Sequence, residues 1–271
     1  MTTPTPLAKR FVRLAQLTLH LLHALFIAAF AYAGKTAAQR DAVRRRWSRR
    51  LLAILHIKLD AHGVPATLPA RCIVASNHIS WLDIFVINAV LPATFVSKAD
   101  VARWPLVGWL CTRAGTLYIE RGSKSGARRA NQSIARALES GAPVAICPEG
   151  TTSYGDELLP FHAALFQPAV DATAEVLPVT LRYRDTHDIP CRSAAYVGDD
   201  SLLDSIWAIV STRHIRAEVT FLPTIASSGL ARRELARATE AAIAAALGVP
   251  APVPNPVRAA EKRSHPPVAP Q

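Results

Sequence analysis

From about residue 57 the chain alternates short apolar runs with longer segments that carry a helical pattern. This alternation is the strongest constraint on the fold, because strands separated by helices build a mostly parallel sheet covered by helices. The predicted fold class is therefore α/β. The expected strands are 71–76, 93–98, 116–121, 143–150, 175–183 and 215–223. The expected helices are 80–91, 104–115, 125–140, 163–171, 201–211 and 230–247. Pro178 is expected only at a strand start or a bulge, because proline has no N–H to donate.

A different pattern precedes this alternation. Residues 14–34 contain no Asp, Glu, Lys or Arg, and their length is close to the roughly 20 residues that span a bilayer. A second helix, basic first and apolar after, is expected at 44–59. The two are predicted to form a membrane-associated helical pair. The chain then divides into N-terminal helices (1–57), an α/β domain (58–248) and a proline-rich, disordered tail (249–271).

The formal net charge of +11 indicates an anionic partner. Nucleic acid is not favoured, since no basic run is interleaved with aromatic residues and no zinc-finger spacing occurs. An anionic membrane is the preferred partner. The excess of Lys and Arg after the first helix predicts an inner (cytoplasmic) membrane location, with the α/β domain on the cytoplasmic side. No metal-ligand cluster is recognisable, so no metal is expected. The four cysteines lie far apart, which predicts reduced thiols.

The stretch ASNHISWLDIF, residues 75–85, lies where an expected strand gives way to an expected helix. Ser80 and Asp83 fit a capping box, in which Ser80 caps the helix and Asp83 lies in its first turn. The same geometry supports catalysis, because open α/β sheets bind ligands at the carboxyl ends of their strands. Asp83 can fix the tautomer of His78, whose other ring nitrogen can take a proton from a hydroxyl. The two interpretations are compatible, since Asp83 can serve both.

The residues NHISWLD resemble the N-H-x-x-x-x-D motif of the glycerolipid acyltransferase family, the 1-acylglycerol-3-phosphate acyltransferases. Three further blocks follow in the family's order. They are residues 95–122, PEGTTS at 148–153 and VLPVTL at 176–181. The likeness covers roughly residues 70 to 185, and an N-terminal helical pair before the first block also suits the family.

This resemblance implies acyl transfer from a thioester, either acyl-CoA or acyl carrier protein, to the hydroxyl of a lysolipid. His78 would be the general base and Asp83 its orienting partner. Arg121 and Lys98 would bind the anionic headgroup, and the block built around Glu-Gly-Thr would contact the acceptor and shape the site. The implied substrate-binding residues are Lys98, Arg121, Glu149, Gly150 and Thr151. No cofactor is expected beyond the thioester co-substrate.

The leading expectation is conversion of 1-acyl-sn-glycerol-3-phosphate to phosphatidic acid. The chain departs from the family at Thr152, however, where many members carry arginine after Glu-Gly-Thr. Because one cation expected near a phosphate is missing, O-acylation of lyso-ornithine lipid, whose headgroup has no phosphate, is an alternative. A non-catalytic lipid-binding protein on an acidic membrane is an alternative from another class. It would use the same basic N-terminus and apolar helix.

Overall fold

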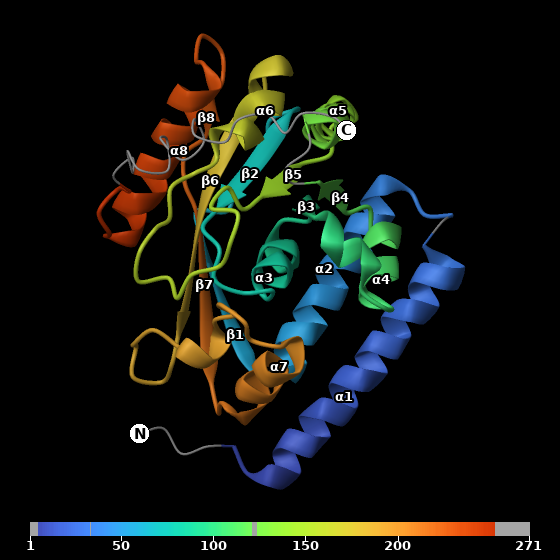
Figure 1. Ribbon diagram of the computed structural model, residues 1–271. Coiled ribbons are helices and arrows are strands. Elements are labelled where there is room, and N and C mark those ends of the chain that lie inside the picture. The colour runs from blue at the N-terminus through green and yellow to red at the C-terminus, as the bar shows by residue number, and fades with distance from the viewer. Residues whose placement is uncertain (1–4, 33, 121–123, 253–271) are drawn as a thin grey trace, which may run out of the picture.

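The computed structural model describes residues 5–32, 34–120 and 124–252, and Figure 1 shows them as a twisted sheet with helices on both sides. Within these residues the sheet contains eight strands in the order β1-β7-β6-β2-β5-β3-β4, with β8 paired to β6. The strands are β1 (Ile57–His62), β2 (Cys72–Ser76), β3 (Thr94–Lys98), β4 (Leu117–Ile119), β5 (Val144–Ile146), β6 (Glu175–Arg184), β7 (Ile215–Phe221) and β8 (Ile225–Ala226).

The sheet is mostly parallel, which confirms the predicted fold class. β2 pairs in parallel with β5 and β6, and β3 pairs in parallel with β5 and β4. β7 is antiparallel to β6, and β1 is parallel to β7. All six predicted strands are present. The sequence pattern did not predict β8, or β1, whose first residues 57–59 were assigned to the second helix. Only Ile57 of β1 is buried, so no apolar alternation marks this edge strand.

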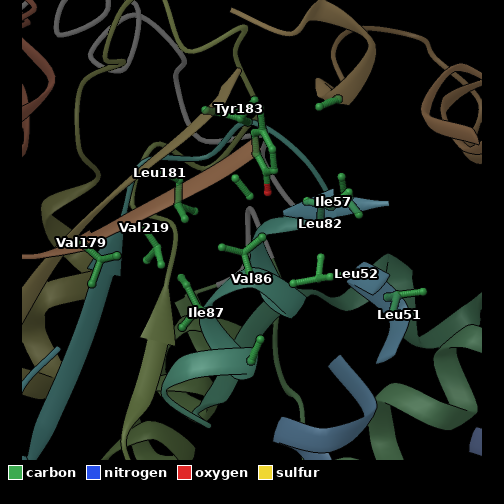
Figure 2. Close-up of a cluster of buried hydrophobic side chains, with 14 of the residues drawn as sticks. Leu51, Leu52, Ile57, Leu82, Val86, Ile87, Val179, Leu181, Tyr183 and Val219 are labelled. Carbon is green, nitrogen blue, oxygen red and sulfur yellow. The ribbon is translucent and has the colours of Figure 1, made fainter. Parts of the chain in front are cut away.

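Helices cover both faces of the sheet. α2 (Ala37–Ile54), α3 (Asp83–Val90) and α7 (Leu202–Ser211) pack on one face, and α5 (Lys124–Glu139), α6 (Gln167–Asp171) and α8 (Arg232–Leu247) pack on the other. β2 supplies both cores, because Cys72 and Val74 face the first group and Ile73 and Ala75 the second. Figure 2 shows the first core, where Leu52, Val86 and Leu181 meet from α2, α3 and β6.

Three expected helices are several residues shorter in the structure. α3 covers only Asp83–Val90, and α4 covers only Val107–Arg113, with a 3-10 helix at residues 99–103 before it. The helix expected at 163–171 divides into a 3-10 turn, Ala163–Phe166, and α6.

The prediction for Pro178 was wrong, since it lies within β6, a central strand, and pairs with Ala75 without a bulge. Its carbonyl accepts from the N–H of Leu222. The proline nitrogen therefore faces the same side, where β8 pairs with residues 175–176 and β7 begins to pair at Val179. The proline falls at this break between two partner strands, so no ladder hydrogen bond is lost there.

The N-terminal helix α1 (Leu7–Phe26) continues through a π-helical stretch, Ile27–Ala31. Together they are long and apolar enough to cross a membrane by length and composition. One side of α1 is fixed to the rest of the protein, because the His20 ring stacks on Trp47 of α2 at 4.3 Å. α2 in turn contributes Leu51 and Leu52 to the main core. The division into three domains stays a prediction, and most of the predicted tail lies outside the described residues.

Candidate active site

Two loops leave neighbouring parallel strands at the same edge of the sheet. Residues 77–82 join β2 to α3, and residues 147–150 follow β5, whose Ile146 pairs with Ala75 of β2. The backbone N–H of His78 donates to Oε1 of Glu149 at 2.6 Å. The first and third sequence blocks therefore meet at the carboxyl ends of two strands, where α/β sheets place their ligands.

Asp83 is the centre of the hydrogen-bond network around His78. Its Oδ2 lies 2.7 Å from His78 Nδ1 and also accepts from the backbone N–H groups of Ile79 and Ser80, at 2.8 and 3.0 Å. Its Oδ1 accepts from the Tyr183 hydroxyl at 2.7 Å. The Asp83 side chain is 0% exposed and that of His78 is 23% exposed. Because a carboxylate only accepts, Nδ1 of His78 carries the hydrogen, and the neutral ring keeps a lone pair on Nε2.

Only half of the predicted capping box is present. α3 begins at Asp83, and its N-cap is Leu82, which makes no side-chain cap bond. The carboxylate of Asp83 does reach back to the N–H of Ser80. The hydroxyl of Ser80, however, is buried without a hydrogen-bond partner in the described part of the chain. The prediction that Ser80 caps the helix was wrong, because the N–H of Asp83, which a capping hydroxyl would accept, donates to the backbone carbonyl of Ser80 instead.

Glu149 holds the two loops together. One carboxylate oxygen accepts from the N–H of His78, and the other accepts from the N–H of Leu159 at 3.0 Å. The side chain is buried. Burial raises the pKa of Glu149 to about 7, although the two N–H donors and the imidazole of His78 oppose the rise. Both oxygens are thus directed at the protein backbone, an arrangement that positions the His78 loop.

Two more residues fix the loop, and sequence reasoning gave neither a role. Asn77 exchanges two hydrogen bonds with the backbone of Leu181 in β6, at 2.7 and 3.0 Å. The sequence feature that could have pointed to Asn77 is its position as the first residue of the motif NHISWLD. Tyr183 belongs to β6, and Figure 2 shows its hydroxyl pointing toward Leu82 at the start of α3. Because burial raises the pKa of Tyr183 well above its ordinary value, the phenol stays a hydrogen-bond donor to Asp83.

A thiol also affects the imidazole of His78. The sulfur of Cys147, which follows β5, lies 3.7 Å from the hydroxyl of Ser76 at the end of β2, and Cys147 is among the groups that raise the pKa of His78. Burial lowers the pKa of His78, but Cys147 and Asp83 together raise the pKa more, so that it lies well above 6.5. The site therefore presents a strongly basic imidazole, oriented by a buried carboxylate, that can accept a proton from a hydroxyl.

Comparisons with known proteins identify the family of this chain. The acyltransferase family profile matches residues 60–182. A lyso-ornithine lipid O-acyltransferase of Pseudomonas aeruginosa is 39% identical over 214 residues, which cover 79% of this chain and 81% of that protein. The chain belongs to the glycerolipid acyltransferase family. A 1-acyl-sn-glycerol-3-phosphate acyltransferase of Neisseria meningitidis serogroup B is 40% identical over 174 residues, 64% of this chain and 68% of the relative. This protein is thus an acyltransferase of the lysophospholipid or lyso-ornithine lipid type.

The fold of this acyltransferase is also found in a solved structure. The crystal structure of the 1-acyl-sn-glycerophosphate (LPA) acyltransferase PlsC from Thermotoga maritima matches with a TM-score of 0.62. The match covers 88% of this chain and 96% of that chain at 18% sequence identity. At this identity the likeness supports the mixed, mostly parallel sheet with its helices and the N-terminal apolar helix.

The other predicted site residues of the acyltransferase lie at the margin of the site. Gly150 has a positive φ of 74°, and its N–H donates to the carbonyl of Cys147. Thr151 is exposed beside it. Lys98 is exposed at the carboxyl end of β3, which β5 separates from β2. Arg121 lies outside the described residues. The described chain contains no group of three or more His, Cys, Asp or Glu that could hold a metal ion.

Thr152, where many family members carry arginine, has a structural contact in this acyltransferase. Its hydroxyl donates to the backbone carbonyl of Tyr196. The N–H of Tyr196 in turn donates to the carbonyl of Ile79 at 3.0 Å. Ser153 completes the link, since its N–H donates to the carbonyl of His78 at 2.9 Å. The third block is therefore bound to the His78 loop through its backbone and the Thr152 hydroxyl, and no cation is needed for that connection.

Proposed function

We propose that this acyltransferase moves a fatty acyl group from a thioester, acyl-CoA or acyl carrier protein, to the free hydroxyl of a lysolipid. His78 acts as the general base and Asp83 orients it. The observation that carries the proposal is the 2.7 Å contact between His78 Nδ1 and a fully buried Asp83 at the carboxyl end of β2. That contact leaves Nε2 to take the hydroxyl proton.

The reaction needs no covalent enzyme intermediate. Nε2 of His78 takes the proton as the hydroxyl oxygen attacks the thioester carbonyl, and Asp83 stabilises the imidazolium that forms. The tetrahedral intermediate then expels the thiolate, which takes the proton back from His78. In this conformation the N–H groups of Ile79 and Ser80 donate to the carboxylate of Asp83, and the N–H of Gly150 donates to the carbonyl of Cys147. No cofactor or metal enters these steps, and the thioester is a co-substrate.

The test is replacement of His78 by alanine in the full-length, membrane-bound protein. Release of free thiol from acyl-CoA, dependent on added lysolipid, should fall by about 10²- to 10⁴-fold, the usual contribution of a general base. His187→Ala is the matched control, because His187 is an exposed loop histidine, and its turnover should equal that of the wild type. Near-normal turnover by His78→Ala would refute the proposal, and a wild-type protein that releases no thiol would indicate a lipid-binding protein instead.

The first acceptor proposed is 1-acyl-sn-glycerol-3-phosphate, which gives phosphatidic acid, with Lys98 and Arg121 as its phosphate ligands. Glu149, Gly150 and Thr151 would border the acceptor. Lyso-ornithine lipid is the second candidate. Thr152 favours it, because a threonine bonded to the Tyr196 carbonyl offers no charge to a phosphate, and relatives of this name match up to 89% of the chain. Turnover of the two acceptors with one labelled thioester decides between them.

We also propose that the protein is bound to the inner (cytoplasmic) membrane with its active site on the cytoplasmic side. The support is the apolar helix at Leu7–Ala31 and the basic residues that follow it. In right-side-out and inverted membrane vesicles, protease should digest the α/β domain only in the inverted ones. Digestion in the right-side-out vesicles alone would contradict this orientation.

A further inference from the structure

α7 has an apolar outer face. Ser205, Ile209 and Val210 face the interior, whereas Leu203 is 77% exposed and Trp207 is 41% exposed. Leu203 and Trp207 are four residues apart and so lie on the same side of the helix. A helix that buries one face in a core usually carries polar residues on the other face. α7 instead presents a leucine and a tryptophan to the outside.

The outer face of α7 continues onto α1. The ring of Phe11 lies 6.4 Å from that of Trp207 in an edge-to-face arrangement, and Phe11 is itself 61% exposed. The guanidinium of Arg13 donates to the carbonyls of Val210 and Thr212 at 2.9 and 2.8 Å, which fixes α1 to the end of α7. Figure 1 shows α7 beside the N-terminal part of α1. We call the exposed residues Leu7, Phe11, Leu203 and Trp207 the α1–α7 surface.

The charge around this surface matches an anionic leaflet. Residues 1–57 contain ten Lys and Arg against one Asp. The guanidinium of Arg10 lies 5.5 Å over the ring of Trp207, so a cation and an amphipathic aromatic ring occupy the same place. Tryptophan is enriched where a protein meets the headgroup region, and arginine there pairs with lipid phosphates. The guanidinium of Arg10 at Trp207 and the excess of Lys and Arg over Asp in residues 1–57 therefore favour an anionic lipid surface over a protein partner, although the exposed Asp204 lies next to Leu203.

The inner face of α7 contacts the catalytic loop. Nε1 of Trp81 donates to Oγ of Ser205 at 3.0 Å, and Trp81 lies between His78 and Asp83 in the sequence. One helix thus carries the exposed Leu203 and Trp207 on its outer side and supports the active site on its inner side. For an enzyme whose acceptor is a membrane lipid, this places the site directly behind the surface.

We propose that the α1–α7 surface docks on an anionic lipid leaflet, with Leu203 and Trp207 entering it beside α1. α7 is then a second membrane contact, separate in sequence from the N-terminal helices. The inference goes beyond acyl transfer, because binding to a leaflet is measured without substrate or turnover.

The experiment measures binding of the full-length protein to vesicles of equimolar phosphatidylglycerol and phosphatidylcholine. Leu203→Glu should weaken binding by roughly tenfold or more, since a charge replaces a side chain that otherwise leaves water. Val64→Glu is the matched control. Val64 is also an exposed apolar residue, but it follows the carboxyl end of β1, whereas α7 leads into the amino end of the parallel partner β7. Its binding should equal that of the wild type.

A second measurement follows the tryptophan directly. Brominated lipids should quench the fluorescence of the wild type more strongly than that of Trp207→Phe, because quenching requires contact with the acyl chains. Unchanged binding of Leu203→Glu, or equal quenching in the two proteins, would overturn the proposal and leave α1 as the membrane contact. An unchanged melting temperature of Leu203→Glu excludes misfolding. Thiol release in detergent micelles tests the acyltransferase reaction separately, so either proposal can fail alone.

Discussion

The carboxyl ends of β2 and β3 differ in how fully their polar residues are engaged. In the loop after β2, Asp83 accepts four hydrogen bonds, and Glu149, from the loop after the neighbouring β5, accepts two, one of them from the β2 loop; both side chains are buried. After β3, Lys98 is exposed to solvent. The hydrogen bonds around the proposed base are thus all formed within the fold itself, whereas Lys98, which is proposed to bind the acceptor, lies exposed at the margin of the site. Substitutions should therefore act through turnover at the first place and through acceptor binding at the second.

Among the substitutions that test this comparison, the largest effect is expected for Glu149→Gln, although it is smaller than that of His78→Ala. An amide has one acceptor oxygen, so the N–H of His78 or that of Leu159 would face an NH₂ group and lose its bond. An unsatisfied buried donor costs about 1–3 kcal/mol, and we expect kcat to fall by about 10- to 100-fold as the His78 loop shifts. Glu240→Gln is the matched control, because Glu240 also accepts a backbone N–H, from Phe161. Equal losses in both variants would show that Glu149 acts on stability alone.

The pH profile tests the effect of Cys147 on the pKa of His78. His78 must be neutral to act as a base, and its pKa is raised above 6.5, so kcat/KM should rise with pH through that higher pKa. Cys147 is among the causes of the rise. In Cys147→Ala the acid limb should therefore move to lower pH, and activity at neutral pH should not fall. Cys111→Ala serves as the control in α4. If the acid limb does not move in Cys147→Ala, the thiol does not raise the pKa of His78.

The smallest effect is expected for Lys98→Ala. Loss of one exposed cation near a phosphate should raise the KM for 1-acyl-sn-glycerol-3-phosphate by only about two- to fivefold, because solvent screens the interaction. kcat and the KM for acyl-CoA should not change. Lys58→Ala, at an exposed position in β1, gives the baseline for loss of one positive charge. If kcat falls more for Lys98→Ala than for Glu149→Gln, the contrast between the two strand ends is mistaken.

The sequence predicted the sheet and the His78–Asp83 pair because both depend on local patterns. Alternating apolar runs mark buried parallel strands, and a short spacing across a strand-to-helix turn marks the pair. The contacts of Tyr183 with Asp83 and of Asn77 with Leu181 join positions about 100 residues apart, and no local pattern records them. β1 was missed for a different reason, since an edge strand with one buried residue carries almost no periodicity. The remaining error concerns the capping box of Ser80 and Asp83. Its spacing is correct, but only one of its two hydrogen bonds, from the N–H of Ser80 to Asp83, is formed.

The Asn77 side chain has a consequence for the motion of the catalytic loop. Its amide both donates to and accepts from the backbone of Leu181, as a peptide group of a paired strand would. The pairing of β2 with β6 therefore extends by one step into the loop that carries His78. We expect the amide hydrogen of Leu181 to exchange with solvent only as slowly as those of the central strands, through opening of the whole sheet. The start of the loop that carries the proposed base, His78, would then open only together with the sheet.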